Sequence, residues 1–238
     1  MSQNVLVTGT GREMALGFQF VRRYLEQGDV VFACVRKPSE ALERLKTAYE
    51  GTLHILTMDI SDTVSVKAAA REVSLVTDHL DLLINNAVTT APDCMKDVLE
   101  ADPDNFAPAM NVGAAGALRV IQAFYPFLKK SGKMALVVNI SSEAGSIGAC
   151  YRTNMTDYAI TKAAVNVITK TLWNAWKEEE NLNILCVHPG WVRTNAGNAL
   201  APFDSYEQAE TLRLLFEKRK NIKDGDIFLT YAGEVYPW

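Results

Sequence analysis

The chain has 238 residues, of which 48% are hydrophobic and 22% charged, so it is long enough to bury a substantial core and is neither disordered nor fibrous. Its formal net charge of -4 and its dispersed lysines and arginines argue against partners such as nucleic acid or an anionic membrane. The start runs straight into a strand pattern and no apolar run reaches the roughly 20 residues that a bilayer requires, so we expect a soluble cytoplasmic protein.

Strand and helix patterns alternate along the whole chain. The apolar runs predicted to be strands are 4–8, 30–35, 53–58, 81–85, 134–140, 183–188 and 227–231. The segments with the i, i+3, i+4 spacing of helices are 14–27, 39–50, 62–78, 103–130, 156–180 and 205–220. Alternation implies right-handed crossovers and a parallel sheet covered on both faces. We therefore expect one α/β domain over 1–238, a doubly wound Rossmann domain with a sheet of about seven strands.

A glycine-containing stretch, "VTGTGREMALG" (7–17), follows the first strand. Gly9 would allow a tight bend, and a helix beginning near Glu13 would point its free N–H groups at a pyrophosphate. The alternative is a tight turn that binds no phosphate. The other strand ends are therefore needed to decide between the two.

Four further motifs follow later strands in the order "DLLINNAV", "VVNISSEAGS", "YAITK" and "HPGWVRT". Tyr158 and Lys162 of "YAITK" are four residues apart and share one helix face. With the first turn, these motifs make the sequence resemble the classical short-chain dehydrogenase/reductase family over essentially the whole chain. The short C-terminal region, "HPGWVRT" and the ending "YAGEVYPW" are similar to the C-signal and sniffer-like carbonyl reductases.

The resemblance implies a set of catalytic residues. Tyr158 matches the proton donor to a carbonyl, Ser142 the hydrogen-bond partner of that oxygen, and Lys162 the lysine beside the tyrosine, while Ser141 stays an alternative to Ser142. Asn111 of "AMNVGAAG" matches the position that holds a water for proton relay. Because a nearby ammonium favours the phenolate, we also expect Lys162 to lower the pKa of Tyr158 towards neutrality.

A nicotinamide dinucleotide is the implied cofactor. The positions that match the family's cofactor contacts are Gly9, Gly11, Arg12, Met14, Arg36, Asp59, Ile60, Asn86, Ala87, Tyr158, Lys162, Pro189, Gly190, Val192 and Thr194. Asp59 would meet the adenine amine or, alternatively, only begin a helix. Val35 stands where an NAD-preferring enzyme has an acidic residue. Since Arg36 and Arg12 would bracket a 2'-phosphate, NADP(H) is expected to be preferred, with NAD(H) possible.

Two positions depart from the family pattern. Glu13 replaces the second glycine of the first turn, where its carboxylate would repel a pyrophosphate unless it points outward or pairs with Arg12. Val88 replaces the last glycine of "NNAV". These departures leave two hypotheses open: an NADP(H)-dependent oxidoreductase that interconverts a ketone or aldehyde and an alcohol, or a non-catalytic nucleotide-sensing or signalling protein on the same fold.

A small-molecule carbonyl or alcohol substrate is expected between 89–96, 144–157 and a substrate loop at about 191–216. Apolar and polar side chains mix there, including Trp191, Leu200, Phe203, Tyr206 and Asn195. Arg152 and Arg193 would either hold an acidic substrate or be solvated surface charges. The 4 cysteines and 3 histidines lack ligand spacing, so no metal site is expected.

The helical segments 103–130 and 156–180 carry apolar residues on more than one face. These residues are Ala114, Ala117, Ile121, Phe124, Val165, Ile168, Leu172 and Trp176. One sheet-facing stripe needs fewer, which predicts a homodimer or homotetramer assembled through these helices, as the resemblance also implies.

Overall fold

The apolar runs form one parallel sheet in a computed structural model that describes residues 2–194 and 199–238. Its strands are β1 (Asn4–Thr8), β2 (Val30–Val35), β3 (Leu53–Thr57), β4 (Leu82–Asn85), β5 (Ala135–Ile140), β6 (Leu182–His188) and β7 (Phe228–Thr230). They lie in the order β3-β2-β1-β4-β5-β6-β7, so the topological switch point falls between β1 and β4. The doubly wound fold with a seven-stranded parallel sheet is confirmed.

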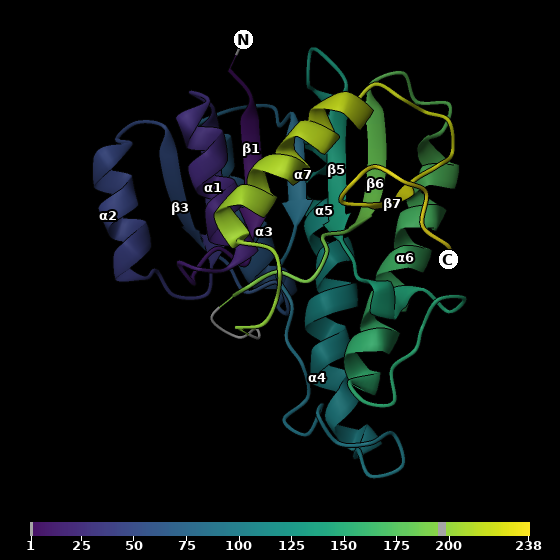
Figure 1. Cartoon of the computed structure of the whole chain (residues 1–238). Helices are drawn as coiled ribbons and strands as arrows, with labels where there is room; N and C mark the ends of the chain where they lie inside the picture. Colours follow the sequence, from purple (N-terminus) through teal and green to yellow (C-terminus); the bar gives the residue numbers. More distant parts are fainter. Residues whose placement is uncertain (1, 195–198) are drawn as a thin grey trace.

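Helices cover both faces of the sheet (Figure 1). One layer holds α1 (Leu16–Glu26), α2 (Glu40–Ala48) and α7 (Ser205–Arg219), and the other holds α3 (Thr63–Ser74), α5 (Gly116–Lys129) and α6 (Thr156–Trp176). Side chains alternate along β1, so Val5 and Val7 pack against the first layer and Leu6 against the second. Burial on both faces explains why the strands are continuous apolar runs.

The segment predicted as one helix over 103–130 is divided into four parts. A 3-10 turn at Pro103–Asn105 leads into α4 (Phe106–Met110), a π-helical turn at Asn111–Ala115 and then α5. The prediction of a continuous helix is therefore wrong in detail. The π-helical turn packs closely on α6, because a Cβ on Gly113 would lie 2.3 Å from Cγ2 of Thr161.

The apolar residues that suggested an assembly surface mostly face the interior. Six of the eight are buried, with relative exposures from 0 to 7%: Ala114, Ala117, Ile121, Phe124, Val165 and Trp176. Ile168 and Leu172 are partly buried. The large hydrophobic side chains of α6 that do reach the surface are Ile160 at 40% and Val167 at 65% exposed. The apolar excess is thus explained by packing inside the chain, and it no longer argues for an assembly surface.

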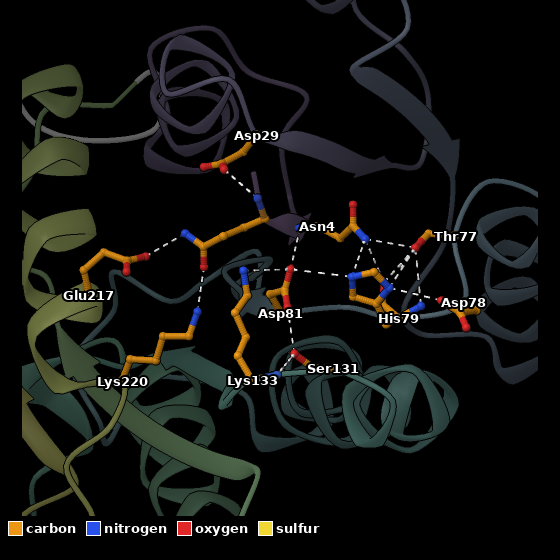
Figure 2. Close-up of polar contacts among 11 residues, drawn as sticks. Asn4, Asp29, Thr77, Asp78, His79, Asp81, Ser131, Lys133, Glu217 and Lys220 are labelled. Atoms are coloured by element: carbon orange, nitrogen blue, oxygen red, sulfur yellow. Dashed lines mark hydrogen bonds and ion pairs between the residues drawn. The ribbon is translucent and has the colours of Figure 1, made fainter. Parts of the chain in front are cut away.

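A polar cluster lies at the amino end of the sheet (Figure 2). Asp81, which precedes β4 and is 1% exposed, accepts hydrogen bonds from the backbone N–H of Asn4 at 2.9 Å and from Oγ of Ser131 at 2.7 Å. Nζ of Lys133 lies 3.6 Å from its carboxylate, and Nε2 of His79 lies 3.9 Å away. The cluster ties β1, β4 and the end of α5 together.

Across residues 2–194 and 199–238, none of the helices combines the length and the apolar character that a membrane crossing needs.

Candidate active site

The motifs that follow β1, β4, β5 and β6 lie at one edge of the sheet, because the strands are parallel and adjacent. The turn after β1 is tied to the end of β4. Nδ2 of Asn86 donates to the carbonyl oxygens of Thr8 at 3.0 Å and Gly9 at 3.2 Å. Gly9 has φ +74, and a Cβ there would lie 2.7 Å from Cα of Ala87. Only glycine fits this combination of backbone conformation and close approach.

The helix after this turn starts later than the sequence predicts. It begins at Leu16 rather than near Glu13, and its N-cap residue, Ala15, provides no side-chain hydrogen bond. The first turn of α1 also has no acidic side chain. Its amide groups are therefore left for a ligand, as binding of a pyrophosphate requires. A Cβ at Gly11 would lie 3.5 Å from Cγ1 of Val35, which is an ordinary contact, so Gly11 is not sterically required there.

Glu13 points away from the strand ends. Its carboxylate lies 3.6 Å from Nη2 of Arg44 on α2, and the side chain is 60% exposed. The expected outward orientation is observed, whereas the ion pair with Arg12 is not: Glu13 pairs with Arg44 instead. Met14 is also exposed, at 56%. The departure from glycine thus places no carboxylate against the edge of the sheet.

The end of β2 is basic and lacks an acidic side chain. Val35 is buried, and Arg36 follows it at the surface. Asp59 lies near enough for the charge of Arg36 to contribute to a lowered pKa, of which hydrogen bonds from Ser61 are the larger cause. Oδ1 of Asp59 accepts from the N–H of Ser61 at 2.9 Å and from its Oγ at 2.6 Å. Asp62, not Ser61, caps α3. Asp59 therefore braces the entry to α3 with one oxygen, and Ile60 beside it is buried.

The two serines after β5 have different surroundings. Ser141 is 1% exposed, and its Oγ donates to Oδ1 of Asn166 at 2.6 Å, which occupies it inside the fold. Ser142 is 4% exposed and lies close enough to Tyr158 for its hydroxyl to counteract the raised pKa of that tyrosine. The geometry favours Ser142 over Ser141 as the residue beside the proton donor.

Tyr158 and Lys162 lie next to each other on α6. Nζ of Lys162 is 5.5 Å from the centre of the Tyr158 ring and donates to the carbonyl of Ile140 at 2.6 Å. Burial lowers the pKa of Lys162 to about 8. Burial also raises the pKa of Tyr158, with a further contribution from Glu143. On balance the pKa of Tyr158 is thus raised by burial rather than brought towards neutrality as expected, and the Lys162 ammonium is directed at a carbonyl oxygen.

Asn111 does not join this group. Its Nδ2 donates to the carbonyl of Ser61 at 3.3 Å, and its Oδ1 accepts from Nη2 of Arg119 at 3.1 Å. It begins the π-helical turn, and such turns occur often at functional sites. A cavity of about 10 Å³, room for no more than one water, lies between this turn and Lys162. A role of Asn111 in proton relay stays a prediction.

Three charged or polar residues beside Ser142 were missed or undervalued at the sequence level. Glu143 follows Ser142 directly, and its Oε2 accepts from Oγ of Ser142 at 2.5 Å. Arg152 forms an ion pair with Oε1 of Glu143, with its Nε at 2.9 Å. Nδ1 of His188, at the end of β6, lies 3.7 Å from Oε2. The only sequence signal was position: each residue follows a strand or precedes "YAITK".

The segment after β6 is held against the start of α7. Gly190 has φ +79, and a Cβ there would lie 2.8 Å from Cε2 of Phe203. Val192 forms a parallel bridge with Phe203, and the carbonyl of Pro189 accepts from Nε2 of Gln208 at 2.6 Å. Thr194 ends the described part of this segment, and Asn195 lies outside the described residues.

Arg193 braces this segment. Its Nη1 donates to the carbonyls of Ala201 at 2.7 Å and Pro202 at 3.1 Å. Neither of the two arginines considered for an acidic substrate is a free cation. Arg193 donates to these carbonyls, and Arg152 forms an ion pair with Glu143. Among residues 2–194 and 199–238, no three His, Cys, Asp or Glu side chains are grouped as a metal site would need.

A nucleotide-binding turn and a Ser-Tyr-Lys group at the carboxyl ends of a doubly wound sheet define a class of dinucleotide-dependent oxidoreductases. A family model described as short chain dehydrogenase matches residues 3–204. The chain belongs to the short-chain dehydrogenase family and is an NAD(P)-dependent oxidoreductase of that family.

Similar proteins have been described in several organisms. An uncharacterized oxidoreductase of Schizosaccharomyces pombe is 31% identical, with 96% of each chain covered. C-signal of Myxococcus xanthus is 29% identical over 69% of this chain and 96% of its own. The structure of NADPH-bound carbonyl reductase from chicken fatty liver is 30% identical, covers 100% of this chain and 99% of its own, and has a TM-score of 0.86. The Drosophila melanogaster carbonyl reductase Sniffer, at 24% identity and full coverage of both chains, shares the fold with a TM-score of 0.87. The resemblance recognised in the sequence is confirmed.

Proposed function

We propose that this protein is an NADP(H)-dependent carbonyl reductase, which interconverts a ketone or aldehyde and an alcohol with Tyr158 as general acid and base. The observation that supports the proposal is that Tyr158 and Lys162 are adjacent on α6, against which the turn that follows Ser142 packs. A structure named as an NADPH-bound carbonyl reductase, at 30% identity over the whole chain, supports the same reaction class.

The residues present fit a nicotinamide dinucleotide. The start of α1, which no side chain caps, offers backbone N–H groups for the pyrophosphate, and the glycine turn before it is fixed against β2 by the N–H groups of Gly9 and Thr10, which donate to Cys34. Bound there, the cofactor supplies or accepts the hydride. Asn86 and Ala87 would lie along its ribose, and Pro189, Gly190, Val192 and Thr194 near its nicotinamide. Ile60 and Asp59 would border the adenine.

In carbonyl reduction, Tyr158 gives its phenolic proton to the substrate oxygen, and in alcohol oxidation it takes that proton back. Ser142 fixes the position of the phenol and of the reacting oxygen. Lys162 is held by the carbonyl of Ile140, so its ammonium stays beneath the Tyr158 ring whether or not the phenol is ionised. A positive charge at that place limits the cost of the phenolate that reduction leaves behind.

A preference for NADP(H) over NAD(H) is the finer part of the proposal. Two exposed arginines, Arg12 and Arg36, would flank the adenosine ribose, and Val35 supplies no carboxylate to accept hydrogen bonds from its hydroxyls. Arginine's planar group suits phosphate oxygens. We expect NADH to bind more weakly but still measurably.

A steady-state assay tests the proposal. NADPH oxidation is followed with a panel of ketones, aldehydes and quinones. The alcohols that correspond to these compounds are then offered with NADP⁺. Turnover of at least one carbonyl that is abolished in Tyr158→Phe is the expected result. Tight NADPH binding with no turnover of any compound would favour the non-catalytic nucleotide sensor, although the outward orientation of Glu13 removes one reason for that alternative.

The cytoplasmic location and the assembly state stay predictions. A homodimer or homotetramer through α5 and α6 would now have to use their outward faces, where Ile160 and Val167 are exposed. Light scattering at micromolar concentration decides it, since a mass of 26.3 kDa would be that of one chain.

A further inference from the structure

Glu143 follows Ser142 directly, and its side chain is only 13% exposed. Its two oxygens have separate partners: Oε2 accepts from Oγ of Ser142 at 2.5 Å, and Oε1 accepts from Arg152. Its backbone N–H donates to Nδ1 of His188 at 3.2 Å. A buried carboxylate with this many fixed partners is a built feature of the site, and the mechanism above does not use it.

The Ser142 hydroxyl has only one proton, and Glu143 takes it. The same oxygen accepts from the N–H of Ala144 at 3.2 Å, which leaves one lone pair. Glu143 therefore fixes the orientation of the Ser142 hydroxyl, which lies close enough to Tyr158 to affect the pKa of its phenol.

Arg152 is held in place by an unusual backbone. Met155, just before α6, has a left-handed conformation with φ 55, and its N–H donates to the carbonyl of Cys94 at 2.6 Å. Nη1 of Arg152 contacts Sδ of Met155 at 3.2 Å. Strained residues of this kind persist only where surrounding contacts enforce them. The turn thus presents Arg152, six residues before Tyr158, to Glu143.

We propose that Glu143 is a positioning residue that acts through Ser142 on Tyr158 and favours carbonyl reduction over alcohol oxidation. This inference rests on the proposed function. Reduction needs a protonated phenol, whereas oxidation needs a phenolate to accept the proton of the alcohol. A fixed negative charge beside Ser142 stabilises the phenol relative to the phenolate.

The ionisation of the cluster agrees with this role. Burial raises the pKa of Glu143, but hydrogen bonds from Ser142 and Arg152 and the charge of Arg152 outweigh it, and the net pKa is lowered. Burial lowers the pKa of His188, and its Nδ1 is an acceptor, so the ring is neutral. The groups that face Glu143 are Ser142, Arg152, Tyr158, His188 and, from the C-terminal segment, Tyr236.

The test follows the titration of Tyr158 without any substrate. The full chain is labelled with ¹³C at Cζ of tyrosine, the Tyr158 signal is assigned with Tyr158→Phe, and its chemical shift is followed with pH. Glu143→Gln keeps the size of the side chain and an acceptor for Ser142 but removes the charge, so the Tyr158 midpoint should move to lower pH. Arg152→Gln should move it to higher pH, because Glu143 then acts without its counter-charge.

Glu210→Gln is the matched control. Glu210 also pairs with an arginine, Arg213 at 2.8 Å, but on α7, and its replacement should leave the Tyr158 midpoint unchanged. An unchanged midpoint in Glu143→Gln, or a shift to higher pH, overturns the proposal. If Glu143→Gln does not fold, Arg152→Gln decides, and a midpoint that fails to rise overturns it.

The shifts in the Tyr158 midpoint are measured on the protein without substrate. Their failure would therefore be distinguishable from failure of the proposed carbonyl reductase activity. Where the carbonyl panel yields a substrate, the pH profile of oxidation of its alcohol gives a second readout. The alkaline rise of kcat should begin at lower pH in Glu143→Gln than in wild type.

Discussion

The two ends of the sheet each bury a charged side chain, but they treat it differently. Asp81 at the amino end receives hydrogen bonds from Asn4 and Ser131 and has Lys133 within 3.6 Å (Figure 2). Lys162 at the carboxyl end has only a carbonyl oxygen as its hydrogen-bond partner among the described residues, and burial lowers its pKa to about 8. Partners compensate the charge at the first end, whereas at the second the charge stays available for chemistry.

A second network at the amino end extends the contrast. Gln3 receives a hydrogen bond from Lys220 at 2.7 Å, donates to Glu217 at 2.8 Å and uses its backbone N–H to bind Asp29. Near Lys162, by contrast, Oδ1 of Asn85 is buried without a hydrogen-bond partner. Asn85 therefore leaves an unpaired polar atom beside Lys162, where a ligand is expected.

The largest effect should come from Tyr158→Phe. Removing the proton donor should lower kcat by about 10³-fold, within the usual range for a positioned general acid. The free energy of unfolding should hardly change. Steady-state kinetics and urea unfolding measure the two quantities, with Tyr151→Phe, a tyrosine that is 76% exposed, as the control. Wild-type turnover by Tyr158→Phe would refute the assignment.

Asp81→Ala should have the opposite signature. It leaves Lys133 and the N–H of Asn4 without their buried acceptor, so the free energy of unfolding should fall by about 3 kcal/mol. Activity per folded molecule should be unchanged, because the site lies at the other edge. Asp78→Ala, at a carboxylate that is 78% exposed, is the control. Loss of activity in a fully folded Asp81→Ala would break the contrast.

Lys162→Met should stabilise the fold while it removes activity. Because burial depresses the pKa of Lys162 from 10.5 to about 8, the unfolded chain binds more protons between these pH values. Wild-type stability should therefore rise with pH through that window, and below pH 8 the destabilisation is complete. The methionine variant should gain about 2 kcal/mol at pH 7 and lose this part of the pH dependence. Unfolding in urea at pH 7 and 9.5 measures it, and a less stable variant would contradict it.

The smallest effect should be that of Arg36→Ala. NADPH should bind about 10-fold tighter than NADH to the wild type, equal to about 1.4 kcal/mol, and the variant should lose most of that margin. Fluorescence titration of both reduced cofactors measures this. Arg71→Ala, a surface arginine on α3, should leave it unchanged. Equal affinities of the wild type for both cofactors, or a preference that survives in Arg36→Ala, would rule out the 2'-phosphate site.

Sequence patterns gave the scaffold reliably, because strand burial on both faces and helix periodicity are local properties. The bounds of β1 and β2 agree with prediction residue for residue. The site was recognisable for the same reason: "YAITK" and "NISS" carry their spacing in the chain itself. The start of α1 was placed near Glu13 because the turn there has no strong capping residue to mark it.

Pair interactions across the fold were not readable. Glu13 has Arg44 as its partner, a residue 31 positions later, and the pairing of Glu143 with Arg152 depends on a turn with left-handed backbone at Met155. The direction of the Lys162 ammonium depends on the carbonyl of Ile140, which no pattern in the side chains encodes. Such contacts arise only when loops from different strands meet.

The π-helical turn at Asn111–Ala115 amounts to one extra residue in a helix that would otherwise run on regularly. Deleting one residue from it would restore ordinary hydrogen bonding but rotate everything upstream by about 100° about the helix axis. Ala109, now 1% exposed, would turn away from its packing, and Asn111 would lose its contacts with Ser61 and Arg119. The shortened helix would be locally more regular, but α4 would lose its packing on α6. We therefore expect insertions and deletions in this segment to be tolerated far less well than substitutions.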